Sequence, residues 1–363
     1  MRIINVVGAR PNMMKMAPIV DAMSGIESVE QRLVHTGQHY DHKMSQVFFD
    51  QLGLPRPDLY LDVGSGSHAE QTARVMVAFE QVLLDQKPDL ILVVGDVNST
   101  LACAITAAKL WIPVAHVEAG LRSFDRTMPE EINRIVTDAL SSYLFTTEID
   151  ANHNLQKEGI SEEKIFFVGN VMIDTLYKHK TKAGSLGTYS HYGLSQGEYA
   201  LLTLHRPSNV DDALILSGIL DALSLIQEQI PILFPMHPRT SQRIDEFGLT
   251  KKIKDASNMH LTEPLGYLEF LDLMMNAGIM LTDSGGIQEE TTILGVPCVT
   301  LRDNTERPVT IRQGTNVLVG SDPLRIVAAV EQILAGEKKQ GVIPELWDGR
   351  AADRIVKILL STR

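Results

Sequence analysis

The chain has 363 residues, of which 44% are hydrophobic and 21% charged, and its formal net charge is −12. This length exceeds that of one ordinary domain, so we expect two domains of similar size, each long enough to bury a core. The composition excludes a disordered or fibrous chain, and the acidic balance argues against nucleic acid or an anionic membrane surface as a partner.

Cys103 and Cys298 lie far apart, each in an apolar segment. This usage indicates two buried thiols in a reducing compartment and no disulfide framework. The apolar run that follows Met1 is too short for the core of a signal peptide, and no later run approaches the roughly 18–20 residues of a membrane span. We therefore expect a soluble, cytoplasmic protein.

Predicted strands and helices alternate along most of the chain. Short apolar or β-branched runs predict the strands, and segments such as 69–87 and 211–229, with apolar residues at three- and four-residue steps, predict helices between them. In the first half the predicted strands are Arg2–Val7, Arg32–Thr36, Leu59–Val63, Asp89–Val94, Pro113–Val117, Tyr143–Thr147 and Ile165–Val168. In the second half they are Tyr199–Leu204, Pro231–Met236, Asn258–Leu261, Gly278–Thr282, Val296–Leu301 and Asn316–Val319. This alternation predicts an α/β fold built on doubly wound parallel sheets.

The alternation breaks once, from about Asn170 to Gly197, where the chain is polar and has no strand signal. We expect a helix and a linker there, and we place a first Rossmann-like domain at 1–170 and a second at 171–350. A last amphipathic helix is expected over 351–363, and packing back onto the first domain is one of its two options. Because ligands bind at the carboxyl ends of parallel strands, the residues that follow each strand are the candidates for a site.

After the first predicted strand, Gly8 permits a tight turn and Pro11 suits the first turn of a helix. Arg10 and Lys15 then lie near the N-terminus of that helix. Basic residues there oppose the helix dipole, and this favours an anion-binding site over ordinary surface charges.

A second anion site is predicted where Ser284, Gly285 and Gly286 stand between a strand and a helix. Ser284 is expected to cap the helix, and the two glycines let backbone N–H groups approach a phosphate. Glu290 lies one turn further along, where a carboxylate suits ribose hydroxyls.

Acidic and basic side chains follow several other strands. Asp96 and Glu118 each end a buried apolar strand, where an unpaired carboxylate is costly, so we predict that they act as acids or bases. Glu130 and Glu131 begin a predicted helix, and Glu131 is interpreted as a partner of the helix dipole. The cationic or titratable residues that end strands of the second half are His205, Arg206, His237, Arg239, Arg302 and Arg307. Together these residues predict a nucleoside-diphosphate site with carboxylates near the group attached to the diphosphate.

Two other patterns carry little weight. Residues 64–69, Gly-Ser-Gly-Ser-His-Ala, match a dinucleotide-binding pattern, but the preceding strand is short and polar and no acid stands at the ribose position. We interpret these residues as a loop. The spacing of His35, His39, His42 and His116 is not that of metal ligands, and no metal is predicted.

Taken in chain order, several segments resemble one family. GARPNMMKMAP, VVGDVNSTLA, AHVEAGLRS, MPEEINR, TLHRP, LTDSGGIQEE and RDNTERP are similar to the motifs of the non-hydrolysing bacterial UDP-N-acetylglucosamine 2-epimerases, over about residues 2–320. The resemblance implies a GT-B fold, with the active site in the cleft between two Rossmann-like domains. It also implies interconversion of UDP-N-acetylglucosamine and UDP-N-acetylmannosamine for surface polysaccharide synthesis, by a homodimer that needs no cofactor.

The chemistry that the resemblance implies is an elimination and a re-addition. UDP leaves carbon 1 as a base removes the proton on carbon 2, and UDP adds back to the 2-acetamidoglucal after reprotonation on its other face. By motif, the family's catalytic residues correspond to Asp96, Glu118, Glu130 and His205. Its UDP contacts correspond to Arg10, Lys15, Leu265, Phe270, Ser284, Gly285, Gly286, Glu290 and Arg307.

Many bacterial members carry a second, regulatory UDP-N-acetylglucosamine site, whose residues correspond to Gln38, His39, Arg206 and His237. The segment 38–46 departs from the family pattern, which argues against activation of the enzyme by its own substrate at this second site. The segments HTGQHYD and FFDQLGLPRPD also resemble the branch that acts on UDP-2,3-diacetamido-2,3-dideoxyglucuronate, the alternative substrate. The TERP motif with Arg307 favours UDP-N-acetylglucosamine.

Two other classes of protein share much of this pattern. A GT-B glycosyltransferase would have the same fold and the same Ser-Gly-Gly helix, but it would need an open acceptor groove and would not need carboxylates on both faces of the sugar. A non-catalytic nucleotide-sugar-binding protein is disfavoured by the carboxylates at the strand ends.

Overall fold

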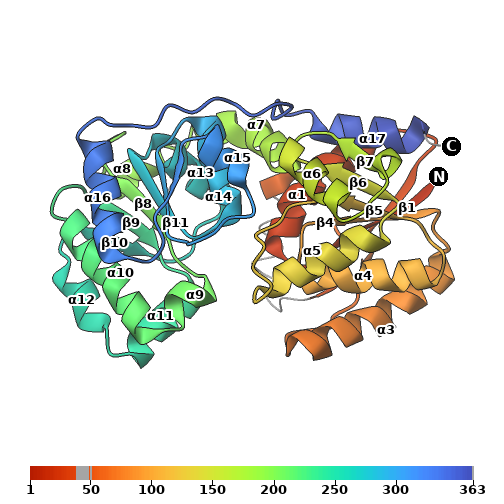
Figure 1. Cartoon of the computed structure of the whole chain (residues 1–363), viewed down its shortest axis with the longest axis horizontal. Coiled ribbons are helices and arrows are strands. Elements are labelled where there is room, and N and C mark those ends of the chain that lie inside the picture. The colour runs from red at the N-terminus through yellow and green to blue at the C-terminus, as the bar shows by residue number, and fades with distance from the viewer. Residues whose placement is uncertain (38–48, 50, 362–363) are drawn as a thin grey trace. The chain divides into compact units, whose positions relative to one another are not determined.

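The chain divides into two compact units in this computed structural model, which describes residues 1–37, 49 and 51–361 (Figure 1). Unit 1 is Met1–Lys178 together with Glu345–Arg363, and unit 2 is His179–Pro344. The division falls inside helix α7 (Val171–Ala183), whose first residue is the one at which the sequence places the second domain.

Unit 1 is built on a parallel sheet of seven strands in the order β3-β2-β1-β4-β5-β6-β7. The strands are β1 (Arg2–Val7), β2 (Glu30–His35), β3 (Leu59–Tyr60), β4 (Leu90–Val94), β5 (Val114–Val117), β6 (Tyr143–Thr146) and β7 (Ile165–Phe167). All seven predicted strands are confirmed, but β3 ends at Tyr60 rather than Val63. Asp62 has a φ of 47°, a left-handed backbone conformation that cannot continue a strand.

Helices cover both faces of this sheet. They are α1 (Arg10–Met23), α3 (His68–Gln86), α4 (Asn98–Lys109), α5 (Pro129–Leu140), α6 (Ile149–Lys157), α7 and α17 (Ala351–Ser361), with a short 3-10 turn at Glu162–Lys164. Helix α4 packs against β1, β4 and β5 and contacts α3 and α5, whereas α1 packs against β1 and β4 and contacts α17. Every residue of β4 is buried, which explains why its sequence is continuously apolar.

The loop over residues 64–67 leads into α3, as the sequence analysis predicts. Ser67 is the N-cap, its hydroxyl accepts a hydrogen bond from the backbone N–H of Glu70, and the Glu70 carboxylate accepts one from the backbone N–H of Ser67. This is a capping box, and it accounts for the polar residues at this position without a nucleotide.

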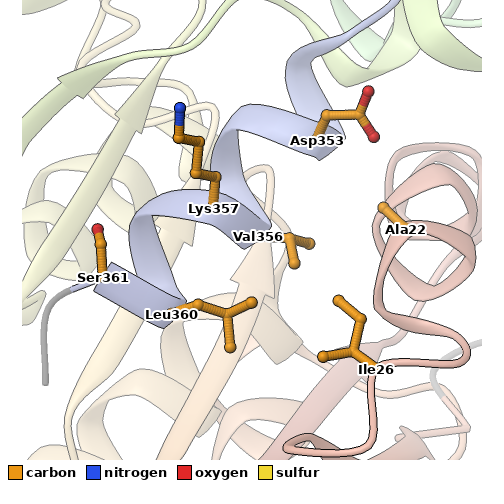
Figure 2. A pocket seen from close by; sticks show the side chains of 7 residues that line it. All are labelled: Ala22, Ile26, Asp353, Val356, Lys357, Leu360 and Ser361. Carbon is orange, nitrogen blue, oxygen red and sulfur yellow. The ribbon is translucent and has the colours of Figure 1, made fainter.

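The C-terminal segment belongs to unit 1. Trp347 is fully buried and donates a hydrogen bond to the backbone oxygen of Thr147 at 2.8 Å. Asp174 of α7 accepts hydrogen bonds from the first two backbone N–H groups of α17, at 3.1 and 2.7 Å. A hollow beside α17 is lined by side chains of this helix, Val356 and Leu360 among them, and by Ala22 and Ile26 of α1 and the turn after it (Figure 2).

Unit 2 repeats the strand order of unit 1. Its parallel sheet has six strands in the order β10-β9-β8-β11-β12-β13. They are β8 (Ala200–Thr203), β9 (Ile232–Pro235), β10 (Met259–Thr262), β11 (Ile279–Thr282), β12 (Cys298–Thr300) and β13 (Asn316–Leu318), and all six were predicted. The order in which the chain adds strands to the sheet reverses between β1 and β4 in unit 1 and between β8 and β11 in unit 2. Such a reversal opens a ligand crevice at the carboxyl ends of the strands.

The helices of unit 2 differ in length, and four of them have six residues or fewer. They are α8 (Thr188–His191), α9 (Pro207–Val210), α10 (Ala213–Ile226), α11 (Pro238–Glu246), α12 (Thr250–Asp255), α13 (Tyr267–Asn276), α14 (Gly285–Leu294), α15 (Pro308–Arg312) and α16 (Pro323–Leu334). Helices α10 and α16 pack together, and their buried residues form one apolar cluster with the strands of the sheet. Within the described part of the chain, no helix is long and apolar enough to cross a membrane.

Candidate functional site

A buried ion pair lies at the carboxyl end of the sheet in unit 1. The Lys15 ammonium on α1 pairs with the carboxylate of Glu118, which directly follows β5, and the two side chains are only 8% and 2% exposed. A Cβ at Gly95 would lie 3.0 Å from the Lys15 ammonium, so glycine at this turn leaves room for the pair. The structure thus brings together a predicted UDP contact and a predicted catalytic carboxylate, and the lysine charge is compensated by Glu118.

The backbone of Glu118 is strained. Its φ is 70°, a left-handed conformation that costs a residue with a side chain of this size on the order of 1–3 kcal/mol. Such strain persists where the surrounding structure fixes it, and it is frequent at functional sites. The turn after β5 therefore holds the Glu118 carboxylate in one defined position.

Asp96 follows β4 and pairs with Arg134 of α5. Arg134 is buried, and its Nη2 also lies 2.6 Å from Glu131. Glu131 in turn accepts hydrogen bonds from the backbone N–H groups of Ser123 and Phe124, at 3.0 and 2.9 Å. Burial alone would raise the pKa of Glu131, but these hydrogen bonds and the arginine charge lower it overall. Glu131 lies in the first turn of α5, as expected for a partner of the helix dipole, but it is also buried and pairs with Arg134.

Glu130 lies half-buried in the first turn of α5, one residue before Glu131. The strands β4 and β5, whose ends carry Asp96 and Glu118, are hydrogen-bonded neighbours in the sheet. The structure consequently places these three predicted catalytic carboxylates at one end of unit 1, on two adjacent strand ends and the first turn of one helix.

In unit 2 the N-terminus of α14 adjoins a buried arginine. Ser284 occupies the N-cap position, but contrary to the prediction its hydroxyl makes no capping hydrogen bond. A Cβ at Gly285 would lie 2.6 Å from Nη1 of Arg307 and 2.7 Å from Oε1 of Glu306, so a larger residue would displace these side chains. Arg307 pairs with Glu306 and, at 2.7 Å, with Glu289. Backbone donors and a guanidinium therefore converge at this helix end.

Glu290 lies deeper in α14 and is buried. It accepts a hydrogen bond from the hydroxyl of Tyr267 at 2.9 Å. Burial, helped by the nearby Glu289 and opposed by the Tyr267 hydrogen bond, raises the pKa of Glu290 to about 8. Leu265 and Phe270, the predicted contacts of the uracil, flank Tyr267 in sequence and are half-buried.

His205 follows β8 and lies beside a fully buried acid, Asp283, at the end of β11. Its Nδ1 is 2.9 Å from Oδ1 of Asp283. The other carboxylate oxygen of Asp283 accepts the backbone N–H groups of His205 and Arg206, at 2.9 and 2.7 Å. Burial would raise the pKa of Asp283, but the hydrogen bonds and charge of His205 and these backbone donors lower it overall. Asp283 thus orients His205, a role that the sequence analysis missed.

The predicted regulatory residues are placed only in part. The His237 ring lies 5.5 Å from that of His205, between ring centres, and it caps α11 by accepting the backbone N–H of Arg239. Nη2 of Arg206 is 3.7 Å from Glu306. The positions of Gln38 and His39 fall outside the described residues, as does the side chain of Arg10, which begins α1.

A family model described as UDP-N-acetylglucosamine 2-epimerase matches residues 21–360. The chain belongs to this family. The fold agrees, because the crystal structure of Methanocaldococcus jannaschii UDP-GlcNAc 2-epimerase in complex with UDP-GlcNAc and UDP superimposes with a TM-score of 0.93 at 45% identity, covering 99% of each chain. These findings confirm both the predicted family and the α/β fold of GT-B type.

Two relatives in this epimerase family bear different names. The protein of Methanocaldococcus jannaschii named UDP-N-acetylglucosamine 2-epimerase is 46% identical over 364 residues, with 99% of each chain covered. A Pseudomonas aeruginosa protein named UDP-2,3-diacetamido-2,3-dideoxy-D-glucuronate 2-epimerase is 42% identical over 363 residues, again with 99% of each covered. Both branches that the sequence analysis weighed are therefore related to this chain over its whole length.

Arg134, Asp283 and Glu306 are the residues of the site that sequence reasoning passed over. A signal for each was present: Asp283 directly follows a strand, and Arg134 and Glu306 belong to the MPEEINR and TERP motifs. Within the described ranges, no group of three His, Cys, Asp or Glu side chains is arranged to hold a metal ion.

Proposed function

We propose that this member of the UDP-N-acetylglucosamine 2-epimerase family interconverts UDP-N-acetylglucosamine and UDP-N-acetylmannosamine. One observation carries the proposal: Asp96 and Glu118 lie at neighbouring strand ends, and each is held by a buried cation. Carboxylates fixed in this way suit the transfer of a proton to or from carbon 2 of a sugar, and a protein that only binds nucleotide sugars would not need them.

The proposed reaction begins when a carboxylate removes the proton on carbon 2 as the bond from carbon 1 to UDP breaks. The product is 2-acetamidoglucal and UDP. A second group, acting as an acid, returns a proton to the opposite face of carbon 2, and UDP adds back to carbon 1. We assign these proton transfers to the set Asp96, Glu118 and Glu130, whose placement at one end of unit 1 supports the assignment.

The departing diphosphate gains negative charge, which positive groups that are already in place stabilise best. In unit 2 we assign this task to the N-terminus of α14, to Arg307 and to His205. The absence of a Ser284 capping bond supports the assignment, because it leaves the first N–H groups of the helix available to a phosphate. Asp283 supports it as well, because its contact with Nδ1 fixes the orientation of the His205 ring.

The nucleoside is assigned to the Glu290 side of α14. A carboxyl group with a pKa of about 8 is neutral at pH 7, so it both donates and accepts hydrogen bonds with ribose hydroxyls at little cost of burial. Leu265 and Phe270 provide half-buried apolar surface for the uracil. Lys15 and Arg10, predicted as UDP contacts, retain that role in the proposal.

The alternative substrate is UDP-2,3-diacetamido-2,3-dideoxyglucuronate, favoured by the relative at 42% identity. This sugar carries an additional carboxylate, which a binding site would match with a cation. The two buried arginines near the carboxyl end of the unit 1 sheet are already paired with acidic side chains: Arg134 with Asp96 and Glu131, and Arg122 with Asp138 and Glu158. This pairing supports the uncharged sugar as the substrate.

The deciding experiment incubates the protein with UDP-N-acetylglucosamine in deuterated water and follows carbon 2 by NMR. We expect deuterium at carbon 2 and the manno epimer, without added NAD or metal. If neither forms, the substrate is wrong, and the diacetamido-uronic nucleotide is tested under the same conditions. Transfer of the sugar to an acceptor, with no deuterium at carbon 2, would instead indicate a glycosyltransferase.

We also propose that the protein works as a homodimer in the cytoplasm, supplies a precursor of surface polysaccharide and needs no cofactor. These features come from the family resemblance. Light scattering after size-exclusion chromatography tests the dimer, and a single peak at the mass of one chain would contradict it.

A further inference from the structure

A histidine with no exposed surface lies behind the two strand-end carboxylates of unit 1. His116 is part of β5, two residues before Glu118. Both of its ring nitrogens are hydrogen-bonded: Nδ1 lies 2.6 Å from Oδ1 of Asp138, and Nε2 lies 2.8 Å from the backbone oxygen of Gly95. Gly95 directly precedes Asp96, so one imidazole connects the ends of β4 and β5.

The partners of the ring determine how many protons it carries. The carbonyl oxygen of Gly95 can only accept, so Nε2 must bear a proton. Asp138 is already surrounded by donors, since its Oδ2 accepts the backbone N–H of Gly120 at 3.0 Å and lies 2.7 Å from Nη2 of Arg122. Burial would raise the pKa of Asp138, but the charges and hydrogen bonds of His116 and Arg122 lower it overall, so Asp138 is a carboxylate that accepts from Nδ1. His116 therefore donates from both nitrogens, as an imidazolium.

A buried imidazolium needs a balancing negative charge, and Asp138 can provide it only if Arg122, its other cationic partner, is balanced as well. Glu158 fills this role: it accepts two hydrogen bonds from Arg122, of 2.8 and 2.7 Å, in addition to the contact of Arg122 with Asp138. Two cations, His116 and Arg122, thus face two carboxylates, Asp138 and Glu158. A neutral network of this kind avoids the large cost of an uncompensated charge in the interior.

Each partner of the ion pair holds the turn of one candidate carboxylate. His116 binds the carbonyl of Gly95, immediately before Asp96. Asp138 binds the N–H of Gly120, which closes the turn that begins at the strained Glu118; these two residues have φ of 77° and 70°. We propose that His116 and Asp138 form an ion-pair clamp that positions Asp96 and Glu118 for proton transfer, an inference that rests on the proposed function.

The geometry separates this role from two others. His116 cannot relay a proton to the substrate, because it has no exposed surface and both of its nitrogens are engaged by Asp138 and Gly95. The pair is also more than a packing contact. A neutral imidazole has one nitrogen without hydrogen, and the lone pair of that nitrogen would face either the Gly95 carbonyl oxygen or the Asp138 carboxylate oxygen, which is repulsive. His116 and Asp138 are therefore positioning residues, which act through Asp96 and Glu118.

The charge of His116 is tested in the full-length wild-type protein, independently of activity. The protein is labelled with 15N in the histidine rings, and the signal of His116 is assigned by its loss in His116→Gln. We expect one-bond couplings to hydrogen at both ring nitrogens at neutral pH. A neutral tautomer, with one bare nitrogen, would overturn the clamp as an ion pair.

The positioning role is tested by kinetics of His116→Gln, whose side-chain amide retains donors but carries no charge. We expect kcat and the rate of deuterium exchange at carbon 2 to fall about tenfold to hundredfold, since a small displacement of reacting groups has effects of this size. The dissociation constant of UDP should change less than twofold. Rates are expressed per UDP-binding site, counted by calorimetry, so that unfolded protein does not contribute. Asp138→Asn is the second variant, in case His116→Gln does not fold.

Phe79→Leu is the matched control. Phe79 is a fully buried core residue of α3 in unit 1 and is absent from the clamp. It should lower the melting temperature and leave kcat per UDP-binding site unchanged. If His116→Gln or Asp138→Asn behaves in the same way, the pair is merely structural and the proposal is overturned. A wild-type protein that turns over neither nucleotide sugar would overturn the proposed function itself, whereas an active wild type with unimpaired variants would overturn only the clamp.

Discussion

The Lys15–Glu118 pair gives the most direct test of the energetics of the site. Lys15→Met removes the charge and keeps the length of the aliphatic chain, so the Glu118 carboxylate loses its buried counter-ion. Because both side chains are less than one-tenth exposed, solvent screens this loss little. Breaking a buried pair by removing one partner costs about 3–5 kcal/mol of unfolding free energy. For a domain of this size that corresponds to a melting temperature lower by about 6–20 °C.

The double variant Lys15→Met/Glu118→Gln separates this pair from its surroundings. Once the carboxylate is neutral, the missing ammonium no longer matters, so the double variant should be more stable than the sum of the single changes predicts. We expect a coupling free energy of about 2–3 kcal/mol, at the upper end of the range for residues in contact.

Tryptophan fluorescence during urea denaturation is the assay, because the only tryptophans of the chain, Trp111 and Trp347, both belong to unit 1. Trp347 is 0% exposed and Trp111 is 94% exposed, so the change in signal follows the burial of Trp347 and thus the unfolding of unit 1. A cost of Lys15→Met below about 1 kcal/mol, or additive single and double variants, would refute the pairing as a stabilising contact.

Three further predictions concern turnover, pH and UDP binding. Asp96→Asn and Glu118→Gln should each nearly abolish epimerisation while UDP binding stays measurable by calorimetry. Burial raises the pKa of Asp174 to about 6, so the folded state favours its neutral form. As the pH rises from about 4 to 6.5, the wild-type protein should therefore lose up to about 3 kcal/mol of unfolding free energy relative to Asp174→Asn. Gly285→Ala would place a Cβ 2.6 Å from Nη1 of Arg307, and the displaced guanidinium should weaken UDP binding about tenfold or more.

Each of these predictions has an outcome that contradicts it. Unimpaired turnover of either carboxylate variant would remove that residue from the catalytic set. For Asp174, denaturation midpoints of wild type and variant that run parallel with pH would show that the buried carboxyl does not titrate near pH 6. An unchanged dissociation constant in Gly285→Ala would mean that Arg307 does not contact UDP.

The strands could be predicted from the sequence because of how this fold buries them. A strand covered by helices on both faces leaves a continuous apolar run, and β4, all of whose residues are buried, is such a run. The error at β3 arose because Asp62 adopts a left-handed conformation, which is set by its neighbours in the turn and leaves no mark in the hydrophobic pattern.

The site could be predicted as a set of strand ends but not as a set of pairs. The topology of a parallel sheet locates Asp96, Glu118 and His205, since each follows a strand. Which cation reaches which carboxylate depends on the helix that lies over the strand end, and the spacing in sequence does not determine this: Arg134 is 38 residues from Asp96. For the same reason Lys15 was expected to await an anion, although Glu118 already neutralises it.

The discontinuity of unit 1 has a consequence for how the chain folds as it is made. Trp347 lies in the core of this unit, and α7 is joined to the first turn of α17 through Asp174, so unit 1 includes residues that follow unit 2 in the sequence. Unit 2 lies wholly within 179–344 and is complete earlier. On the ribosome, the usual order of N-terminal before C-terminal folding is therefore reversed: all of unit 2 is synthesised before the segment 345–361 that completes unit 1.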